Sequence, residues 1–331
     1  MKRKCVRSAQ GELHWSRMAE LPTSSLRCAD ERTVMAARFI TTTQVIAEEL
    51  VRAAEAAQSW QASAKCEAIR VFRKRTKLMR AALGVLGRGE DRAVCEAMLE
   101  ILGEANRLLS PLRDHDVLRR TIRLAGALFP DEQQRSVRTV LSTALLLHAR
   151  AHAEITKGDD RAFEEAVLTR VVKAAHRVRT AVKSLAGLEL RRREIAASIE
   201  SKWKSARGAL RAAIVTRELA LLHAARKEIA AVAGCIGAWQ GTSEPSRRVT
   251  RFRRRLARIA QSLGEDRDFA LLADRLVLER THIASEEMLE DVLNAILVRR
   301  KQIQCSIRRD AKQLVKYRQD DLHTMLLDDL S

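Results

Sequence analysis

Between Pro130 and Pro245 the chain contains no proline, and its 331 residues include only 4 Pro and 13 Gly. Proline interrupts helices because it lacks the backbone donor and clashes with the preceding turn, and glycine weakens them because it is too flexible. From Thr43 onward apolar residues recur at helical spacing, and strand-like alternation is not sustained anywhere. The sequence therefore predicts an all-α fold built from long helices.

Short clusters of turn-forming residues divide this helical pattern. They are GRGED (87–91), SP (110–111), FPDE (129–132), KGDD (157–160), AGLE (186–189), QGTSEPS (240–246) and LGED (263–266). We expect about eleven helices in all. Because the connections are short, successive helices should be antiparallel neighbours. Aromatic residues make up only 3% of the chain, so we expect a core of closely packed aliphatic side chains.

One motif occurs twice. LLSPLRDHDVL (108–118) resembles SLGEDRDFALL (262–272), and an Arg-Lys pair precedes each copy, at Arg73 and Lys74 and at Arg226 and Lys227. The Arg-Lys pairs are 153 residues apart and the Arg-Asp pairs of the two motifs are 154 apart. Such a constant offset is typical of an internal duplication. It pairs 43–60 with 190–213, 62–86 with 215–239, and 131–156 with 284–310.

The duplication predicts two pseudo-symmetric antiparallel helical bundles around a basic groove or cavity. The first half would span 36–158 and the second 187–320, with 159–186 as a bridging helix. Residues 1–35 show no sustained period, so we expect a disordered basic arm there, and 321–331 would form a C-terminal tail.

The chain carries 61 Lys and Arg against 42 Asp and Glu, a net charge of +19. This excess attracts polyanions, although net charge alone is also compatible with a merely soluble basic protein. Clustering of the charges favours the hypothesis that the protein binds a polyanion. Arg70, Arg73, Lys74, Lys77 and Arg80 fall on one face of the predicted helix 62–86. Between residues 65 and 86 the single acidic residue is a glutamate at position 67. Like charges on one face of a helix repel each other. A stripe of this kind is therefore expected where a bound anion lies over it.

The corresponding stripe in the second half is thinner. It begins with His223, Arg226 and Lys227, but alanines stand at 230 and 233, where the first stripe has Lys77 and Arg80. Further positive charge comes from Lys202, Lys204 and Arg207 on the preceding helix and from RRVTRFRRRLAR (247–258), which includes Arg254.

HAARK at 223–227 is similar to the H-x-x-R-K signature of CHAD domains, the conserved-histidine α-helical domains. ALRAA before it, SLGEDRDFALLADRL (262–276), and RKRTKLMR and LRDHDVL in the first half resemble other recurring blocks of that family. The resemblance covers about residues 36–320. It implies two pseudo-symmetric helical bundles around a basic cavity and the binding of inorganic polyphosphate; the family is not known for catalysis.

The resemblance assigns the family's functional positions to this chain residue by residue. Together with the charges described above, the candidate polyphosphate-binding residues are Arg70, Arg73, Lys74, Lys77, Arg80, Arg113, Lys202, Lys204, Arg207, His223, Arg226, Lys227, Arg254 and Arg267. Arg113 and Arg267 would lie at helix starts, and the aspartates that follow them would cap helices or orient arginines.

Three positions depart from the family pattern. Arg70 stands in place of the first signature histidine, Arg267 in place of a frequent histidine of the second copy, and Ala230 in place of a lysine. Arginine keeps the positive charge, so anion binding is retained at the first two positions. The first half therefore lacks the imidazole that a titrating role at this position would need.

The sequence favours binding over catalysis and predicts no catalytic residue, no metal site and no cofactor. The Gly-rich phosphate loop, GxSxG and HExxH motifs are missing, and His148 and His152 at i and i+4 have no third ligand at convincing spacing. Six scattered cysteines and the lack of a run of about 18 apolar residues favour a reducing cytoplasm without membrane insertion.

Two other functions remain open. Non-specific nucleic-acid binding fits the charge, but one Tyr and four scattered Trp offer little base stacking. A scaffold at polyphosphate or storage granules would use the C-terminal helices to bind a protein partner.

Overall fold

The structure is a computed structural model that describes residues 31–59, 62–87, 91–156, 159–185, 192–216, 218–240, 246–283 and 285–327. All regular secondary structure in these ranges is helical, so the prediction of an all-α fold is confirmed. Most of the predicted basic arm, residues 1–30, lies outside the described residues. The first helix begins at Glu31, slightly before the predicted domain boundary.

Eleven α-helices and one short 3₁₀-helix make up the described chain. They are α1 (Glu31–Ser59), α2 (Ala62–Leu86), α3 (Arg92–Leu108), α4 (Ser110–Gly126), α5 (Gln134–Thr156), α6 (Asp160–Ser184), α7 (Arg192–Thr216), α8 (Leu219–Gln240), α9 (Arg247–Leu278), η4 (Arg280–His282), α10 (Glu286–Leu314) and α11 (Gln319–Leu327).

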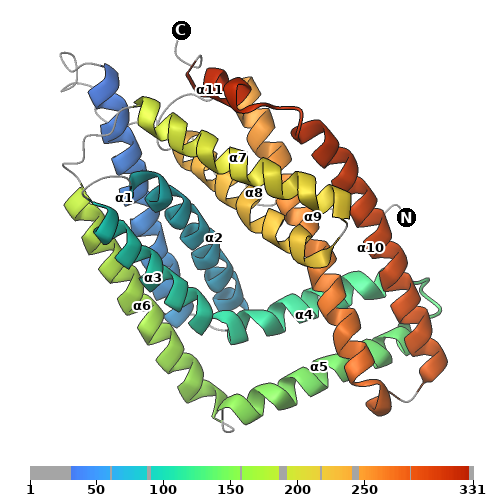
Figure 1. The fold of residues 1–331 in the computed structure, drawn as a ribbon. Coiled ribbons are helices and arrows are strands. Elements are labelled where there is room, and N and C mark those ends of the chain that lie inside the picture. Colours follow the sequence, from blue (N-terminus) through green and yellow to red (C-terminus); the bar gives the residue numbers. More distant parts are fainter. Residues whose placement is uncertain are drawn as a thin grey trace, which may run out of the picture.

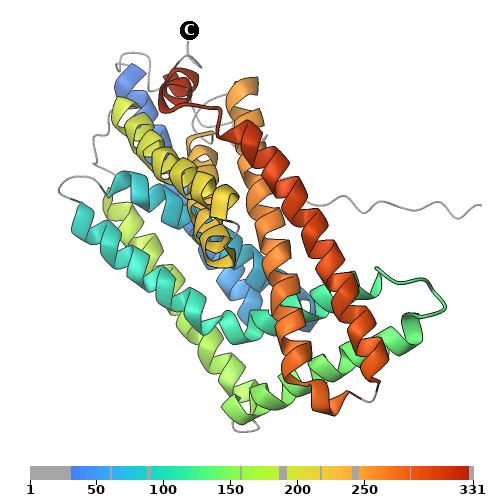
Figure 2. The same ribbon diagram turned by 45° about the vertical axis from the view of Figure 1, so that its right-hand side comes forward.

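The helices form two groups joined at the centre (Figure 1). In the first group α1 packs against α2 and α6, and α3 packs against α2 and α6. In the second group α7, α8 and α9 pack in succession, and α10 lies beside α9. Helices α2 and α8 pack against each other and join the groups. Helices α4 and α5 run across the molecule, where they contact the end of the α9–α10 pair, as both ribbon views show (Figures 1 and 2).

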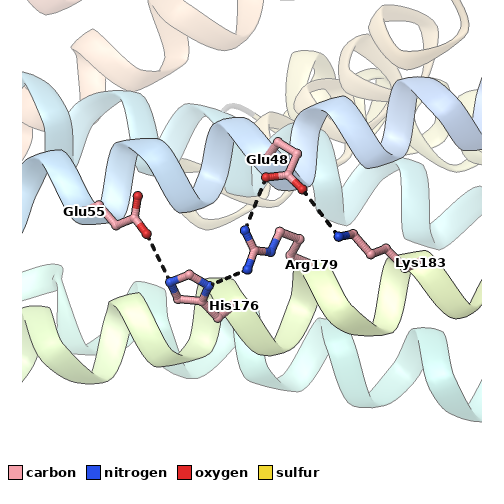
Figure 3. A network of polar contacts seen from close by, with 5 residues as sticks. All are labelled: Glu48, Glu55, His176, Arg179 and Lys183. Atoms are coloured by element: carbon pink, nitrogen blue, oxygen red, sulfur yellow. Dashed lines mark hydrogen bonds and ion pairs between the residues drawn. The ribbon is translucent and has the colours of Figure 1, made fainter.

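Helix α6, the predicted bridging helix, is tied to α1 by a polar network (Figure 3). Glu48 accepts from Arg179 at 3.5 Å and pairs with Lys183 at 4.0 Å. Arg179 Nη2 lies 3.0 Å from His176 Nδ1, and His176 Nε2 lies 3.1 Å from Glu55. If Arg179 donates to Nδ1, the imidazole proton is on Nε2 and is donated to Glu55. The network fixes α6 within the first helix group.

Helices α2 and α8 approach closely at small residues. A Cβ added at Gly234 of α8 would lie 2.8 Å from the Cβ of Ala81 on α2, so only glycine fits there. The Cys235 thiol donates to the Ala81 carbonyl at 3.4 Å. Ala81 and Gly234 occupy equivalent positions at the 153-residue offset of the sequence. Equivalent residues meet in this way near a two-fold axis, but the pseudo-symmetry of the whole halves stays a prediction.

The predicted break at LGED (263–266) is wrong. Helix α9 continues through these residues without interruption. The first copy of the motif does break, since α3 ends at Leu108 and α4 begins at Ser110. The difference has a simple cause. Pro111 cannot donate a helical hydrogen bond, whereas the second copy has Glu265 in its place.

Of the predicted C-terminal tail, 321–331, residues 321–327 are helical and belong to α11. Helix α11 packs against α7 and buries Leu322 and Leu326. His323 of α11 pairs with Glu200 of α7. Residues 328–331 lie outside the described chain.

Candidate anion-binding pocket

A pocket of about 300 Å³ lies between α2, α4, α8 and α9; we name it the central pocket. Its lining includes the cationic residues Arg70, Arg73, Lys74, Lys77, Arg113, Arg120 and Arg226 and the acidic residues Asp116, Glu265 and Asp268. Cations from three helices therefore converge on one small volume with only partial neutralisation.

Helix α2 supplies four of these cations from the stripe that the sequence indicates. Arg70 is exposed and bonds both carboxylate oxygens of Glu67, at 2.8 and 2.9 Å, which neutralises its charge. Arg73 is half-buried and donates to the Asn106 carbonyl at 3.0 Å, near the C-terminus of α3. This bond fixes the guanidinium at the pocket wall. Lys74 and Lys77 are the lysines of the stripe, and both are exposed.

Lys77 lies close to three other cations of the central pocket, Arg73, Arg113 and Arg226. Its side chain keeps access to solvent, but the surrounding protein removes much of the water from its ammonium group. This desolvation, followed by the charges of Arg226 and Arg73, lowers the pKa of Lys77 from 10.5 to about 8. Desolvation and the charge of Arg113 likewise lower the pKa of Arg73 to about 10. A bound anion would stabilise both charged forms.

Arg226 reaches the central pocket from α8 because α9 has a glycine at the contact. A Cβ added at Gly264 would lie 3.2 Å from Nη2 of Arg226, closer than ordinary van der Waals contact. The guanidinium therefore packs directly against the α9 backbone. Desolvation lowers the pKa of Arg226, and the nearby Asp268 carboxylate opposes this change.

Asp268 is an acidic residue among the arginines. Burial raises its pKa, although Arg113 and Arg226 act in the opposite direction. The sequence predicted that Asp268 caps a helix or orients an arginine. It does not cap a helix, because it lies in the interior of α9. Asp114 is not a cap either, since the residue before α4 is Leu109 and no side chain caps this terminus. Asp114 instead pairs with Arg113 at 3.6 Å.

The structure brings six predicted residues together in the central pocket: Arg70, Arg73, Lys74, Lys77, Arg113 and Arg226. The others lie elsewhere. Arg80 lines a shallow depression beside α3, and Lys202 lies against Gly84 toward the end of α2. Lys204, Lys227 and Arg254 are exposed on α7, α8 and α9, and Arg207 donates to the Val315 carbonyl at 2.9 Å. Arg267 lies in the interior of α9, beside Arg226 and Asp268, and not at a helix start. The side chain of His223 lies outside the described residues.

Sequence reasoning missed two cations. Arg120 lines the central pocket and follows Arg113 by two helical turns, so helical spacing could have indicated it. Arg253 contacts Gly237 of α8, and its charge acts on Lys74. The buried Nε of Arg253 has no hydrogen-bond partner among the described residues. A sequence motif cannot distinguish it from the exposed Arg254, because only packing decides which of two adjacent arginines faces inward.

Clusters of metal ligands and membrane-spanning helices are both missing from the described part of the chain. No group of three or more His, Cys, Asp or Glu residues there could hold a metal ion. The side chains of His148 and His152, the weak metal candidates, lie outside that part. None of the described helices is long and apolar enough to cross a membrane.

The fold and the pocket define an all-α protein with a basic cavity between its helices. A family-wide sequence profile of the CHAD domain matches residues 44–277, from within α1 almost to the end of α9. The chain therefore belongs to the CHAD family, a family associated with polyphosphate binding. A search of curated proteins finds no match to the chain.

Proposed function

We propose that the protein binds inorganic polyphosphate in the central pocket and does not catalyse its turnover. The observation that carries this proposal is the convergence of cations from α2, α4 and α8 on one pocket. Desolvation, followed by the charges of Arg226 and Arg73, lowers the pKa of Lys77 there to about 8. Without an anion this arrangement is electrostatically unfavourable. A chain of phosphates, each with about one negative charge, would relieve the repulsion along its length.

The chemistry of the pocket favours phosphate over nucleobases. Guanidinium groups bind phosphate oxygens in pairs, and lysine ammonium groups add mobile point charges. Phe269 is the aromatic residue among the described lining residues, so a platform for base stacking is poor. A volume of about 300 Å³ suits a thin inorganic chain, whereas duplex DNA is far wider. Non-specific nucleic-acid binding is the second candidate.

The same residues support a binding role over a catalytic one. Cys66 lines the pocket, but burial raises the pKa of its thiol, which opposes formation of the nucleophilic thiolate. Asp268 is half-buried. Arg113, Arg226 and Arg267 act on its carboxylate, so its proposed role is to orient these arginines. Incubation with long-chain polyphosphate should release no phosphate. A cytoplasmic location and association with polyphosphate granules belong to this proposal, and cell fractionation tests both.

Competition between long-chain polyphosphate and duplex DNA at physiological salt tests the function. We expect polyphosphate to displace DNA at matched concentrations of phosphate, and the reverse displacement to be weak. Affinity for both should fall steeply with salt, because binding releases condensed counterions. Equal or reversed preference would replace the proposal with general polyanion or nucleic-acid binding.

A further inference from the structure

A second basic pocket lies at the corner where α10 turns into α11. Its volume is about 590 Å³, and we name it the corner pocket. Arg248, Arg251 and Arg255 of α9 line it together with Lys316 and Tyr317, which follow α10. Its lining residues and those of the central pocket are different throughout the described chain. The corner pocket is therefore a separate feature.

The corner is rigidly built. Trp203 Nε1 of α7 donates to the Tyr317 carbonyl at 3.2 Å, and Arg207 Nε donates to the Val315 carbonyl at 2.9 Å. The ring of Phe252 meets the Tyr317 ring edge-on, with centroids 5.1 Å apart. The chain's single tyrosine thus lies in a fixed position between α7 and α9. These contacts hold the wall of the pocket in place before any ligand binds.

The charge of the corner pocket is mostly uncompensated. Four cationic residues line it, whereas the acidic residue in its lining is Asp321. The Asp321 carboxylate accepts from the Arg318 amide at 2.6 Å, which caps the start of α11. Arg251 and Lys316 are exposed and so are open to a ligand. The N-terminus of α9 adds positive partial charge beside Arg248.

The two pockets lie on opposite sides of α9. Arg255 of the corner pocket and Gly264 of the central pocket are separated by about 180° around the helix and by about 13 Å along it. A single short anion therefore cannot fill both pockets. A long polymer in one pocket leaves the other open to a second segment.

We propose that the corner pocket is a second anion site, which binds oligophosphate groups independently of the central pocket. Guanidinium groups from one helix and an ammonium group from the opposite wall can grip successive phosphates. Inorganic oligophosphate and the phosphate tail of a nucleotide share this chemistry. Titration with triphosphate and with ATP distinguishes the two sources, because tighter binding of ATP would show a contribution from the base.

The arrangement has a consequence for long polymers, which rests on the proposed function of the central pocket. One protein molecule with two sites can hold two polymer segments, and one polymer can hold many protein molecules. Such multivalent contacts join chains into a network without any additional interface. The protein would then condense long-chain polyphosphate as well as bind it.

Calorimetric titration with inorganic triphosphate tests the corner site. The wild type should bind two molecules per chain. The variant Arg251→Glu/Lys316→Glu should bind one, at the central pocket, and Lys74→Glu/Lys77→Glu should bind one, at the corner. The control Lys173→Glu/Lys301→Glu changes the same net charge at exposed positions of α6 and α10 and should keep two. Unchanged stoichiometry and affinity in Arg251→Glu/Lys316→Glu would overturn the corner site.

Light scattering with long-chain polyphosphate tests the network. The wild type and the control should form turbid mixtures near charge balance. Arg251→Glu/Lys316→Glu should bind the polymer within about tenfold of the wild type but remain clear. Turbidity equal to that of the wild type would contradict the bridging role. In Lys74→Glu/Lys77→Glu the polymer should bind only as weakly as the corner pocket alone allows. Triphosphate bound at the corner in this variant would support the corner site even if the central pocket proved not to bind polyphosphate, so the two proposals fail separately.

Discussion

The two copies of the repeated motif have the same sequence pattern but different structures. In the first copy the helix ends at Leu108, and Pro111 lies near the start of α4. In the second copy α9 runs straight through Gly264 and Glu265. The first copy turns the chain so that α4 crosses toward α9, whereas the second provides a straight wall. A motif that occurs twice can thus keep its Arg-Asp pair while one proline changes its backbone geometry.

The difference allows the two copies to meet. Because α4 crosses the molecule, Arg113 of the first copy lies near Asp268 of the second, and both line the central pocket. Gly264 of the second copy leaves room for Arg226 of α8. The first copy therefore contributes the cation Arg113 to the pocket. The second copy contributes the space at Gly264 and the carboxylate of Asp268.

Among the predictions that follow, a change at the position of the proline in either motif should have the largest effect, and this effect is on the free energy of unfolding. Glu265→Pro places a proline in the middle of α9 and should lower the free energy of unfolding by about 3 kcal/mol or more. Pro111→Ala should change it by less than about 1 kcal/mol, because the helix already ends there. Urea denaturation followed by circular dichroism measures both. Glu265→Ala is the control, since it removes only the partly exposed ion pair with Arg299. Equal effects of Glu265→Pro and Pro111→Ala would contradict the claim that proline determines the difference between the two motifs.

Adjacent cations of α8 should differ in their effect on polyphosphate affinity. Arg226→Met should reduce the affinity by about 30-fold, because charged hydrogen bonds to phosphate contribute about 2 kcal/mol. Lys227→Met should reduce it by less than about threefold, because Lys227 is exposed away from the lining of the central pocket. Titration of both variants at one salt concentration measures the difference. If the two losses were equal, the pocket would not be the site.

The sequence predicted the helical fold because proline and glycine are rare and the apolar periodicity is strong. It also predicted the stripe on α2, where the charges of one helix determine the pattern. It could not predict that residues 263–266 are helical. A glycine between polar residues is typical of a turn, but here Gly264 is a buried helical residue that leaves room for Arg226. Nor could it separate Arg253 from Arg254, since their orientations depend on the packing of α9 against α8.

Affinity should decrease as the pH rises from 7 to 9. Lys77, with a pKa of about 8 among Arg73, Arg113, Arg226 and Asp268, loses its proton in the free protein over this range. We expect up to about a tenfold loss of affinity, with proton uptake on binding near pH 8. Because its pKa is lowered from 10.5, the same group makes the fold more stable as the pH rises from about 8 to 10.5.

The variant Lys77→Arg separates this titration from other effects of pH. Arginine stays protonated, so the affinity of the variant should depend much less on pH. Calorimetry in two buffers of different ionisation enthalpy measures the proton uptake. The same pH dependence in both proteins would mean that Lys77 is not the titrating group.

Gly264→Ala should have the smallest effect. The added methyl group displaces the Arg226 guanidinium, so polyphosphate affinity should fall by about threefold. Stability should change by less than about 1 kcal/mol, because alanine favours the helix while the contact opposes it. Gly208→Ala is a matched control, since a Cβ at Gly208 meets nothing within 4 Å. It should leave affinity unchanged, and a similar loss in both variants would argue against a specific role of Gly264.

The central claim is that a shaped pocket, rather than net charge, binds polyphosphate. The most direct measurement compares the polymer affinities of Lys74→Glu/Lys77→Glu and Lys173→Glu/Lys301→Glu, which carry equal net charge and reverse only exposed lysines. We predict a loss of about 100-fold or more in the first variant and less than about threefold in the second, with unchanged helicity in both. Equal losses in the two variants would show that the overall charge of +19 accounts for binding and would contradict the claim.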